Sequence, residues 1–381
     1  MAQAEAALAL EKFYKGPELV ALTKNQHFVP QLLLRNFTTD GNEDVLLFDS
    51  TRNKVRPSSI RKVLSQNYFY DDDNSVENFL AEKIEGPAAA VIDSIVANPK
   101  QVIKPGLPAL LTFIAVQMMR TPSSNTQALN FVNSFGGQVI EQIAALNGLP
   151  IESAKSLRLK PTDERAMRNH LLLRSTLNRW LLEDLSWHVL SNETNLPFVI
   201  SDHPAVLYNW YLRDSDDPGY TAMTKNGVQI FLPLSPSITL ALIDKSVYKF
   251  GEKGNSHTVL SHRRDVELLN SLQFRARQDF IVFPRSLDEH YIVRSCASIP
   301  ANSLMTVHSG RTDPVLVSGD KLSSDVYVWR TQARYDQWLS VCKIKRRVLK
   351  KSLDYRDRRP HTTAAYIAAA RDFFKLPKRS A

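Results

Sequence analysis

In the first half of the chain, apolar residues recur at the spacing of amphipathic helices. Residues 76–97 place apolar side chains on one broad face, which predicts a helix that Pro87 kinks or splits. Residues 108–120 are apolar nearly all round, so this helix is expected to be buried centrally. A short helix should begin at Pro30, because proline suits the first helical turn. Further helices are predicted at 123–147, 162–190 and 362–375.

From about residue 195 the pattern changes to short runs rich in β-branched and aromatic residues. Such runs between turn residues predict strands, and an earlier alternating stretch predicts a hairpin. The expected strands lie at 42–55 for the hairpin and at 198–201, 205–212, 228–234, 237–243, 279–283 and 326–329. The predicted fold class is therefore α+β, with a helical N-terminal half packed against a mainly antiparallel sheet from the second half.

These elements suggest four parts of the chain. We expect an N-terminal arm at 1–23, a main α+β domain at 24–285, a mixed extension at 286–341 and a basic helical tail at 342–381. A helix from about Tyr335 should continue into the basic run KIKRRVLKK. The tail is thus predicted as a helical C-terminal extension of the body.

The composition is that of an ordinary globular protein. Of 381 residues, 43% are hydrophobic and 23% charged, which is far from the disordered class. Only two cysteines occur, Cys296 and Cys342, and neither belongs to a CxxC pair. This argues for a reducing compartment and against a disulfide framework or a structural zinc site. With no secretory signal pattern and no apolar stretch long enough to span a bilayer, the sequence predicts a cytoplasmic protein without a transmembrane segment.

The positive charge is concentrated at the C-terminal end. Residues 341–381 hold 13 Lys and Arg against 3 Asp, whereas the rest of the chain holds 35 basic and 36 acidic residues. Such a run favours salt-sensitive binding to a nucleic-acid backbone, with Tyr335 and Trp338 placed to stack on bases. An anionic lipid or an acidic protein is an alternative partner. The candidate nucleic-acid-binding residues are Lys343, Lys345, Arg346, Arg347, Lys350 and Lys351.

The string His27-Phe28-Val29-Pro30-Gln31 offers the first candidate chemistry. If Pro30 opens a helix, His27 lies just before its positive end, where the dipole disfavours the protonated ring. Gln31 and Arg35 would then lie one turn apart on one face. This suits a neutral base or a donor to an anion. The alternative is a structural histidine whose ring caps the helix start.

The acidic residues of the 76–97 helix form a second candidate. Glu77 projects near the middle of the apolar face, Glu85 lies at its boundary, and Glu82 faces solvent. A carboxylate amid apolar side chains must be paired, protonated or bound to a metal. A structural salt bridge is the alternative role.

Polar residues also occur where the pattern predicts burial. Gln117 and Arg120 lie three apart in the buried 108–120 segment, so Arg120 needs an anion, for which Glu77 or Glu85 is available. Asp202 follows a short apolar strand, where sites on sheets often gather ligands. The same Asp-His-Pro string is also good turn chemistry.

Several enzyme signatures are absent from the sequence. It has no Walker A loop, no GxGxxG after a strand, no GxSxG, no HExxH and no kinase signature set. Nucleotide hydrolysis, nicotinamide redox chemistry and serine hydrolysis are therefore disfavoured, and no nucleotide or zinc motif is present.

Five strings follow one another in a characteristic order: HFVPQLLLRNF, VENFLAEKIEG, QMMRTP, FVISDHPAV and FLPLSP. In this order and at these intervals they resemble the bacterial domain-of-unknown-function family 4238, whose members typically open with His-x-Val-Pro-Gln and a Leu-Arg-x-Phe. The resemblance covers about residues 24–285. It implies that seven polar side chains form one constellation: His27, Gln31, Glu77, Glu85, Gln117, Arg120 and Asp202.

Two functions of different classes remain open. The first is a metal-dependent nuclease acting on RNA or DNA, in phage defence or a stress response. Glu77, Glu85 and Asp202 would hold Mg²⁺ or Mn²⁺, His27 would act as general base or acid, and Arg120 would stabilise phosphate charge. The alternative is a non-enzymatic component that binds nucleic acid or a protein partner, with the polar constellation as a structural network. The sequence does not indicate an oligomeric state.

Overall fold

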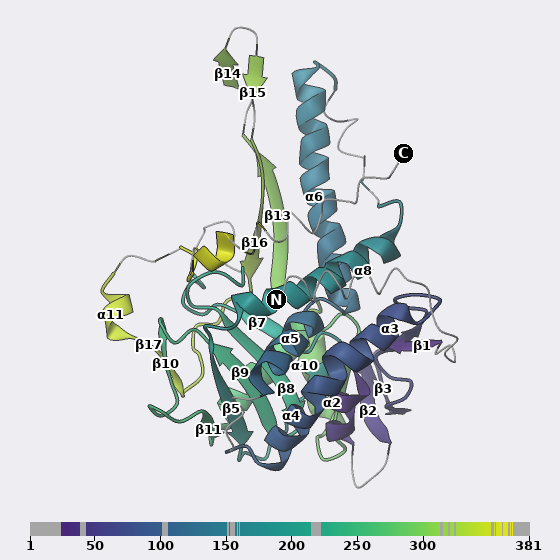
Figure 1. Ribbon diagram of the computed structural model, residues 1–381, viewed down its shortest axis with the longest axis vertical. Helices are drawn as coiled ribbons and strands as arrows, with labels where there is room; N and C mark the ends of the chain where they lie inside the picture. Colours follow the sequence, from purple (N-terminus) through teal and green to yellow (C-terminus); the bar gives the residue numbers. More distant parts are fainter. Residues whose placement is uncertain are drawn as a thin grey trace.

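Two β-sheets form the body of the protein, and a long helix with a β-hairpin rises from it (Figure 1). The computed structural model describes residues 24–38, 43–100, 106–150, 152, 157, 159, 161–214, 222–312, 315–318, 321–323, 325–351, 354, 356–359, 361–364, 366 and 368. The segment predicted as an N-terminal arm, 1–23, lies outside these residues. The α+β class predicted from the sequence is confirmed, and most of the strand pairs are antiparallel.

The larger sheet has five strands in the order β11-β5-β9-β8-β7. Only β11 and β5 run parallel in this sheet. The strands are β11 (His257–Leu260), β5 (Ser186–Asn192), β9 (Ile238–Ile243), β8 (Gln229–Ser235) and β7 (Val206–Tyr208). Every residue of β8 and β9 is buried. This explains their nearly continuous apolar sequence, because a sheet covered on both faces has no polar side.

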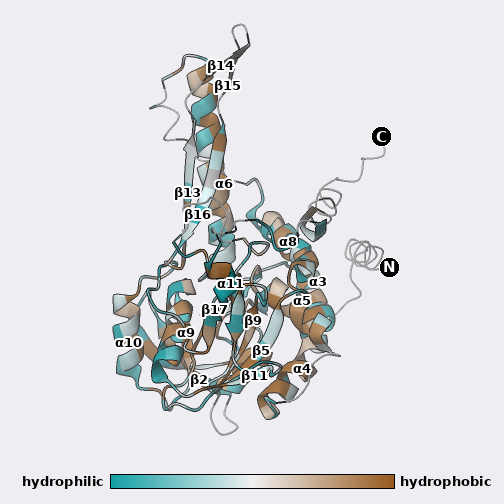
Figure 2. Cartoon of the chain, turned by 90° about the vertical axis from the view of Figure 1, so that its left-hand side faces the viewer, coloured by the Kyte–Doolittle hydropathy of each residue, from teal (hydrophilic) through white to brown (hydrophobic). Residues whose placement is uncertain are grey.

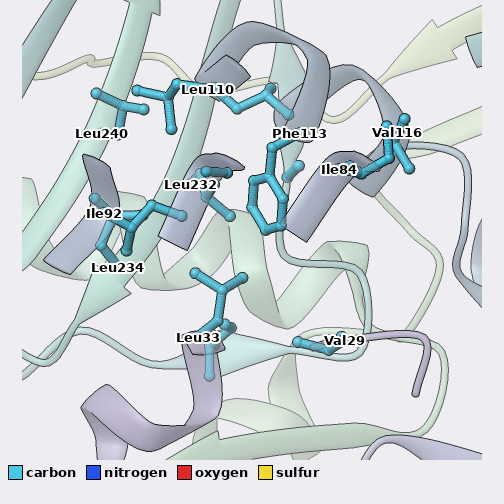
Figure 3. Packing of buried hydrophobic residues seen from close by; sticks show 14 of the residues in the cluster. Val29, Leu33, Ile84, Ile92, Leu110, Phe113, Val116, Leu232, Leu234 and Leu240 are labelled. Carbon is cyan, nitrogen blue, oxygen red and sulfur yellow. The ribbon is translucent and has the colours of Figure 1, made fainter. Parts of the chain in front are cut away.

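Alternate residues of the central strands enter two separate hydrophobic cores. In β8, Leu232 packs in one core and Phe231 in the other. Helices α4 (Gly86–Ala97) and α5 (Leu107–Gln117) contribute to the first core, which Figure 3 shows from close by. Helix α9 (Arg263–Ala276) contributes to the second. The five-stranded sheet is therefore a middle layer between helices.

The smaller sheet joins segments that are far apart in the sequence. Its order is β3-β2-β12-β6, with all pairs antiparallel. The predicted hairpin supplies β2 (Asp44–Asp49) and β3 (Lys54–Ser59), and the second half supplies β6 (Ile200–Ser201) and β12 (Phe280–Phe283). The two halves of the chain are thus interleaved, because the hairpin predicted at 42–55 joins a sheet with strands from the second half.

Residues 75–97 form one helical run that widens in the middle. It consists of α3 (Ser75–Phe79), the π-helical segment η2 (Leu80–Glu85) and α4. Pro87 has no backbone N–H to donate to the carbonyl of the fourth residue before it. In a regular α-helix its ring would also clash with that carbonyl. The π turn loosens this register just before Pro87. Pro87 therefore neither splits nor ends the helix.

The helix predicted at 162–190 is too long. Helix α8 (Glu164–Ser175) is capped by Asp163, whose side chain accepts a hydrogen bond from the Ala166 N–H, and it continues as the 3-10 segment η4 (Thr176–Leu181). Residues 186–192 form β5 instead, paired between β9 and β11. Pairing within the central sheet prevails there over the helical spacing.

The projecting part consists of α6 (Pro122–Leu146) beside β13 (Met305–Arg311) and β16 (Val326–Gln332). We call it the arm, which is distinct from the N-terminal arm predicted at 1–23. Figures 1 and 2 both show the three elements side by side, with β14 (Val315–Ser318) and β15 (Lys321–Ser323) at the tip. The sequence predicted α6 and β16 but not β13. The region predicted as a mixed extension also contains α10 (Glu289–Ser298). Among the described residues, no helix has the length and apolarity needed to cross a membrane.

The basic tail begins as a strand docked on the body. Strand β17 (Cys342–Ile344) pairs antiparallel with β10 (Tyr248–Phe250), and the short helix α11 (Arg346–Leu349) follows it. The helix predicted from Tyr335 is therefore wrong. The reason is packing, because Trp338 is only 6% exposed in the second core. Of the helix expected at 362–375, residues 361–364 are helical and most of the rest lie outside the described residues.

If the segment before the tail belongs to the body, Trp338→Ala should lower the free energy of unfolding by about 3–5 kcal/mol, because it leaves a large cavity. The indole ring stacks on Tyr208 with centroids 4.6 Å apart. The control Leu349→Ala, at a side chain 63% exposed, should change that energy by less than about 0.5 kcal/mol. Urea denaturation of both variants measures this, and equal effects would contradict the docking.

Candidate functional site

Arg120 is the centre of the predicted constellation. Its side chain is fully buried, and its guanidinium donates in three directions. Nε donates to the Tyr70 hydroxyl at 3.1 Å, Nη1 to Glu85 Oε1 at 2.6 Å and Nη2 to the His27 carbonyl at 2.6 Å. A buried cation is tolerated only when it is paired and its protons are hydrogen-bonded. The expectation that Glu77 or Glu85 pairs with Arg120 is met by Glu85.

Local structure explains why these groups meet. Arg120 lies three residues beyond the end of α5, in a turn. Its backbone N–H donates to the Val116 carbonyl. Glu85 ends the π-helical segment, and Tyr70 precedes α3. We call Arg120, Tyr70, Glu85, Glu77 and His27 the arginine network. It ties three segments of the chain together at the side of the first core.

The network holds its charge and its protons firmly. Burial alone would lower the pKa of Arg120, but Tyr70 and Glu85 together raise that pKa above its usual range. Burial raises the pKa of Tyr70 to about 12. The Tyr70 hydroxyl therefore keeps its proton at neutral pH, and it donates to the His27 carbonyl at 3.1 Å. Each of the three guanidinium nitrogens of Arg120 thus donates a hydrogen bond to a group of the protein itself.

Glu77 is the least satisfied member of the network. Burial raises its pKa to about 7, even though the positive charge of Arg120 and the His27 backbone N–H lower it. Its Oε2 is buried and makes no hydrogen bond within the described residues. This carboxyl therefore holds its proton to a much higher pH than an ordinary glutamate does. By contrast, Glu82 on the same helical run is 70% exposed.

His27 does not occupy the position that the sequence suggested. It ends β1 (Asn25–His27), which pairs with β4 (Ser65–Asn67), and no side chain caps α2 (Gln31–Leu34). The ring Nε2 lies 3.0 Å from the Ile60 carbonyl, which can only accept, so Nε2 carries the proton. Burial lowers the pKa of this ring, although the bond to Ile60 raises it. The histidine ring is therefore neutral, as expected. It bonds to the loop after β3, however, and does not cap the helix.

The two glutamines of the constellation differ. Gln117 is fully buried, and its Nε2 donates to the Phe28 carbonyl at 2.9 Å. Its Oε1 makes no hydrogen bond within the part of the chain that the structure describes. Gln31 begins α2 and is partly exposed. Gln117 thus fastens the opening motif to α5, whereas Gln31 is not shown to join the arginine network.

The Asp202 carboxylate is held by backbone groups around the start of β12. Its Oδ1 accepts from the Gln278 N–H at 2.8 Å, and its Oδ2 accepts from the N–H groups of Asp279 and Phe280 at 2.7 and 3.0 Å. Burial raises its pKa to about 6, against the effect of these three bonds. The carboxylate joins the end of β6 to the start of β12. These bonds tie Asp202 to the segment of β12 and not to Arg120, so its place in the constellation stays an untested prediction.

The predicted metal ligands do not come together. Among the residues that the structure describes, no group of three or more His, Cys, Asp or Glu could hold a metal ion. Glu77 and Glu85 lie in the arginine network, whereas Asp202 is bound by backbone N–H groups. The three-carboxylate set is therefore not assembled, and a requirement for Mg²⁺ or Mn²⁺ stays an untested prediction.

The predicted nucleic-acid-binding residues lie on one edge of the body, around β10 and β17. Five of the six are exposed, and Lys345 is half-buried, with its Nζ donating to the Lys245 carbonyl at 2.5 Å. The structure adds two lysines that the sequence analysis missed, Lys245 and Lys249, because strand pairing brings them there from about 100 residues away. We call the whole set the basic surface: Lys245, Lys249, Lys343, Lys345, Arg346, Arg347, Lys350 and Lys351.

Tyr70 and Gln26 were also missed. Gln26 is fully buried, and its Oε1 accepts from the Tyr70 N–H at 2.6 Å while its Nε2 donates to Asp71. Neither residue carries a periodic signal, since Tyr70 stands in the loop string NYFYDDD. Only the three-dimensional contact shows that they hold the arginine network in place.

The matched family agrees with the resemblance seen in the sequence. Residues 25–286 match the family described as "Protein of unknown function (DUF4238)". This chain belongs to that family. No curated protein and no solved structure matches it. The match includes the whole arginine network and β10, and it ends before β17, so only Lys245 and Lys249 of the basic surface lie inside the family region.

The raised pKa of Glu77 predicts a pH-dependent stability. The folded chain keeps this proton up to about pH 7, whereas an ordinary glutamate loses it near 4.5, so wild-type stability should fall as the pH rises between these values. Glu77→Gln imitates the protonated acid. It should change the free energy of unfolding little at pH 5 and raise it by up to ~3 kcal/mol at pH 8.

Chemical denaturation at several pH values measures this difference. The matched control is Glu82→Gln, whose exposed side chain should give the same small effect at every pH. A Glu77→Gln variant that is less stable than wild type at pH 8 would show that the ionised carboxylate stabilises the fold, which contradicts the burial argument.

Proposed function

We propose that this protein binds nucleic acid through the basic surface, with the arginine network serving to hold the fold. Two observations support the proposal. Eight cations from two distant segments gather on one edge of the body. The side-chain donors of Arg120 are directed at Tyr70, Glu85 and His27, which leaves this arginine engaged inside the protein.

The pairing of Lys249 with Lys343 is the observation that carries the proposal. These residues stand directly opposite each other in the β10–β17 pair, and both are exposed. Like charges in this position destabilise a sheet by roughly 0.2–1 kcal/mol. Within the described residues, neither lysine forms an ion pair that would relieve this repulsion. A bound polyanion relieves it and releases counterions at the same time.

The contacts are expected to be with the phosphate backbone rather than with bases. Trp338, which was expected to stack on bases, is buried against Tyr208, so that expectation is wrong. Tyr335 is half-buried, its hydroxyl bonds to Ser271 at 2.8 Å, and its ring meets Tyr208 edge-on. Contacts to phosphates position a protein without reading sequence. Binding should therefore be sensitive to salt and insensitive to sequence.

The nuclease hypothesis stays an untested second candidate, as does a role in phage defence or stress. One observation favours it: two buried oxygens, Glu77 Oε2 and Gln117 Oε1, make no hydrogen bond within the described residues. Such orphan acceptors indicate missing donors. However, Arg120 is the group that would have to stabilise phosphate charge, and it is fully buried. The binding function therefore takes precedence.

Neutralising the exposed part of the basic surface tests the binding proposal. The variant Arg346→Gln/Arg347→Gln/Lys350→Gln/Lys351→Gln should bind a labelled 30-mer at least about 10-fold more weakly at physiological salt. Its plot of log affinity against log salt should flatten by about 0.7–0.9 for each phosphate that the variant no longer neutralises. All four side chains are exposed, so the fold should be unaffected.

A matched variant removes four exposed cations elsewhere: Lys54→Gln, Arg56→Gln, Lys62→Gln and Lys83→Gln. It should keep the wild-type affinity and salt slope. Equally weakened binding in both variants would refute a specific surface, and binding to anionic vesicles in place of nucleic acid would assign the surface to a membrane. Incubating the wild type with labelled RNA and DNA and added Mg²⁺ or Mn²⁺ tests cleavage in the same experiment.

A further inference from the structure

A cavity of about 370 Å³ lies at the base of the arm. Its walls come from the turn after α5, the first turns of α6, the residues after β6, the end of α9, and strands β13 and β16. Its volume is within the range of small-molecule sites, which are usually concave and mostly apolar. The nucleic-acid proposal does not involve this cavity, because none of its lining residues belongs to the basic surface.

Most of the wall is apolar and adaptable. Met118 and Met119 line it from the turn after α5, the same turn that directs Arg120 toward the arginine network. Met223 and Met305 add two further thioethers. Methionine is unbranched and polarisable, so such walls fit ligands of irregular shape. One turn of the chain therefore has a structural side and a side that faces the cavity.

Two arginines provide positive charge inside this wall. The side chain of Arg330, on β16, makes no ion pair or hydrogen bond within the described residues, and burial lowers its pKa. Arg275 donates from Nη1 to the Ser303 hydroxyl at 3.2 Å, but its buried Nε makes no hydrogen bond among the described groups. None of the described lining residues is an Asp or a Glu. The cavity thus holds cations without an internal counter-charge.

His203 adds a neutral donor to the same wall. Its Nδ1 lies 2.6 Å from the Thr121 hydroxyl, and that hydroxyl accepts the Ser124 N–H as the cap of α6. The Thr121 hydroxyl also donates to Ser124 Oγ at 3.4 Å, so its contact with Nδ1 is compatible with either tautomer of the neutral ring. Burial lowers the pKa of His203 to about 4, so the ring stays neutral at pH 7. The tautomer with its N–H on Nε2 offers a hydrogen bond to an anion in the cavity.

We propose that this cavity binds a small organic anion, one with a carboxylate or phosphate head and an apolar body. The guanidinium groups of Arg275 and Arg330, with His203, would hold the head. Guanidinium groups present paired donors that match carboxylate and phosphate oxygens. The Met and Leu wall would bury the body. Such a ligand contacts both the arm, through Arg330 and Met305, and the sheet, through Leu207.

Isothermal titration calorimetry on the full chain with four probes tests this proposal. Octanoate and octyl phosphate carry both features, 1-octanol lacks the charge, and inorganic phosphate lacks the apolar body. At least one of the two charged amphiphiles should bind at least about 10-fold more tightly than 1-octanol and than inorganic phosphate. The better of octanoate and octyl phosphate identifies the head group. If neither binds, or if 1-octanol binds equally well, the proposal is wrong.

Substitutions then locate the site. Arg330→Met and Arg275→Met should each raise the Kd of the better probe by about 10-fold, because each removes a charge-assisted bond. The control is Arg334→Met, close to the end of β16, where the side chain is 68% exposed and pairs with Asp214. It should leave the Kd unchanged. Equal effects of all three variants would overturn the assignment. Nucleic-acid affinity should be the same in all of them, which separates this site from the basic surface.

Discussion

The buried guanidinium of Arg120 is the interaction on which the arrangement of the first core depends. It joins the opening strand through the His27 carbonyl, the loop before α3 through Tyr70, and the π-helical segment through Glu85. A charge taken out of water is stable only where each of its protons finds an acceptor. The position of α5 is thereby fixed relative to the strand and the helical run, and with it the helical layer over the central sheet.

This constraint also separates structure from function within the molecule. The polar residues of the family motifs were expected to form one site, but several of them bond to other parts of the protein. The guanidinium of Arg120 donates to protein groups, and the Asp202 carboxylate accepts from three backbone N–H groups. The positive charges that have no acidic partner among the described residues lie elsewhere. They are the opposed lysines Lys249 and Lys343, and the arginines of the cavity at the base of the arm. Unrelieved positive charge indicates where anions are expected to bind.

The spacing of apolar residues predicted those features that depend on the burial of a single helix. The apolar face of residues 76–97 and the uniform burial of α5 were legible, and so was the need of Arg120 for an acidic partner. Features that depend on distant segments were not. The strand β5 was read as helix because its neighbours β9 and β11 follow it in sequence. The tail was read as helix because nothing in its own sequence shows that β10 would pair with it.

The central claim is that Arg120 holds the fold and takes no part in binding or chemistry. Arg120→Met tests it directly, by measuring the free energy of unfolding together with nucleic-acid affinity at low temperature, where the variant remains folded. The account predicts a loss of about 3–5 kcal/mol in stability, because removing the cation leaves the largely buried Glu85 carboxylate without its partner, with unchanged affinity. A variant of wild-type stability that no longer binds or cleaves nucleic acid would contradict it.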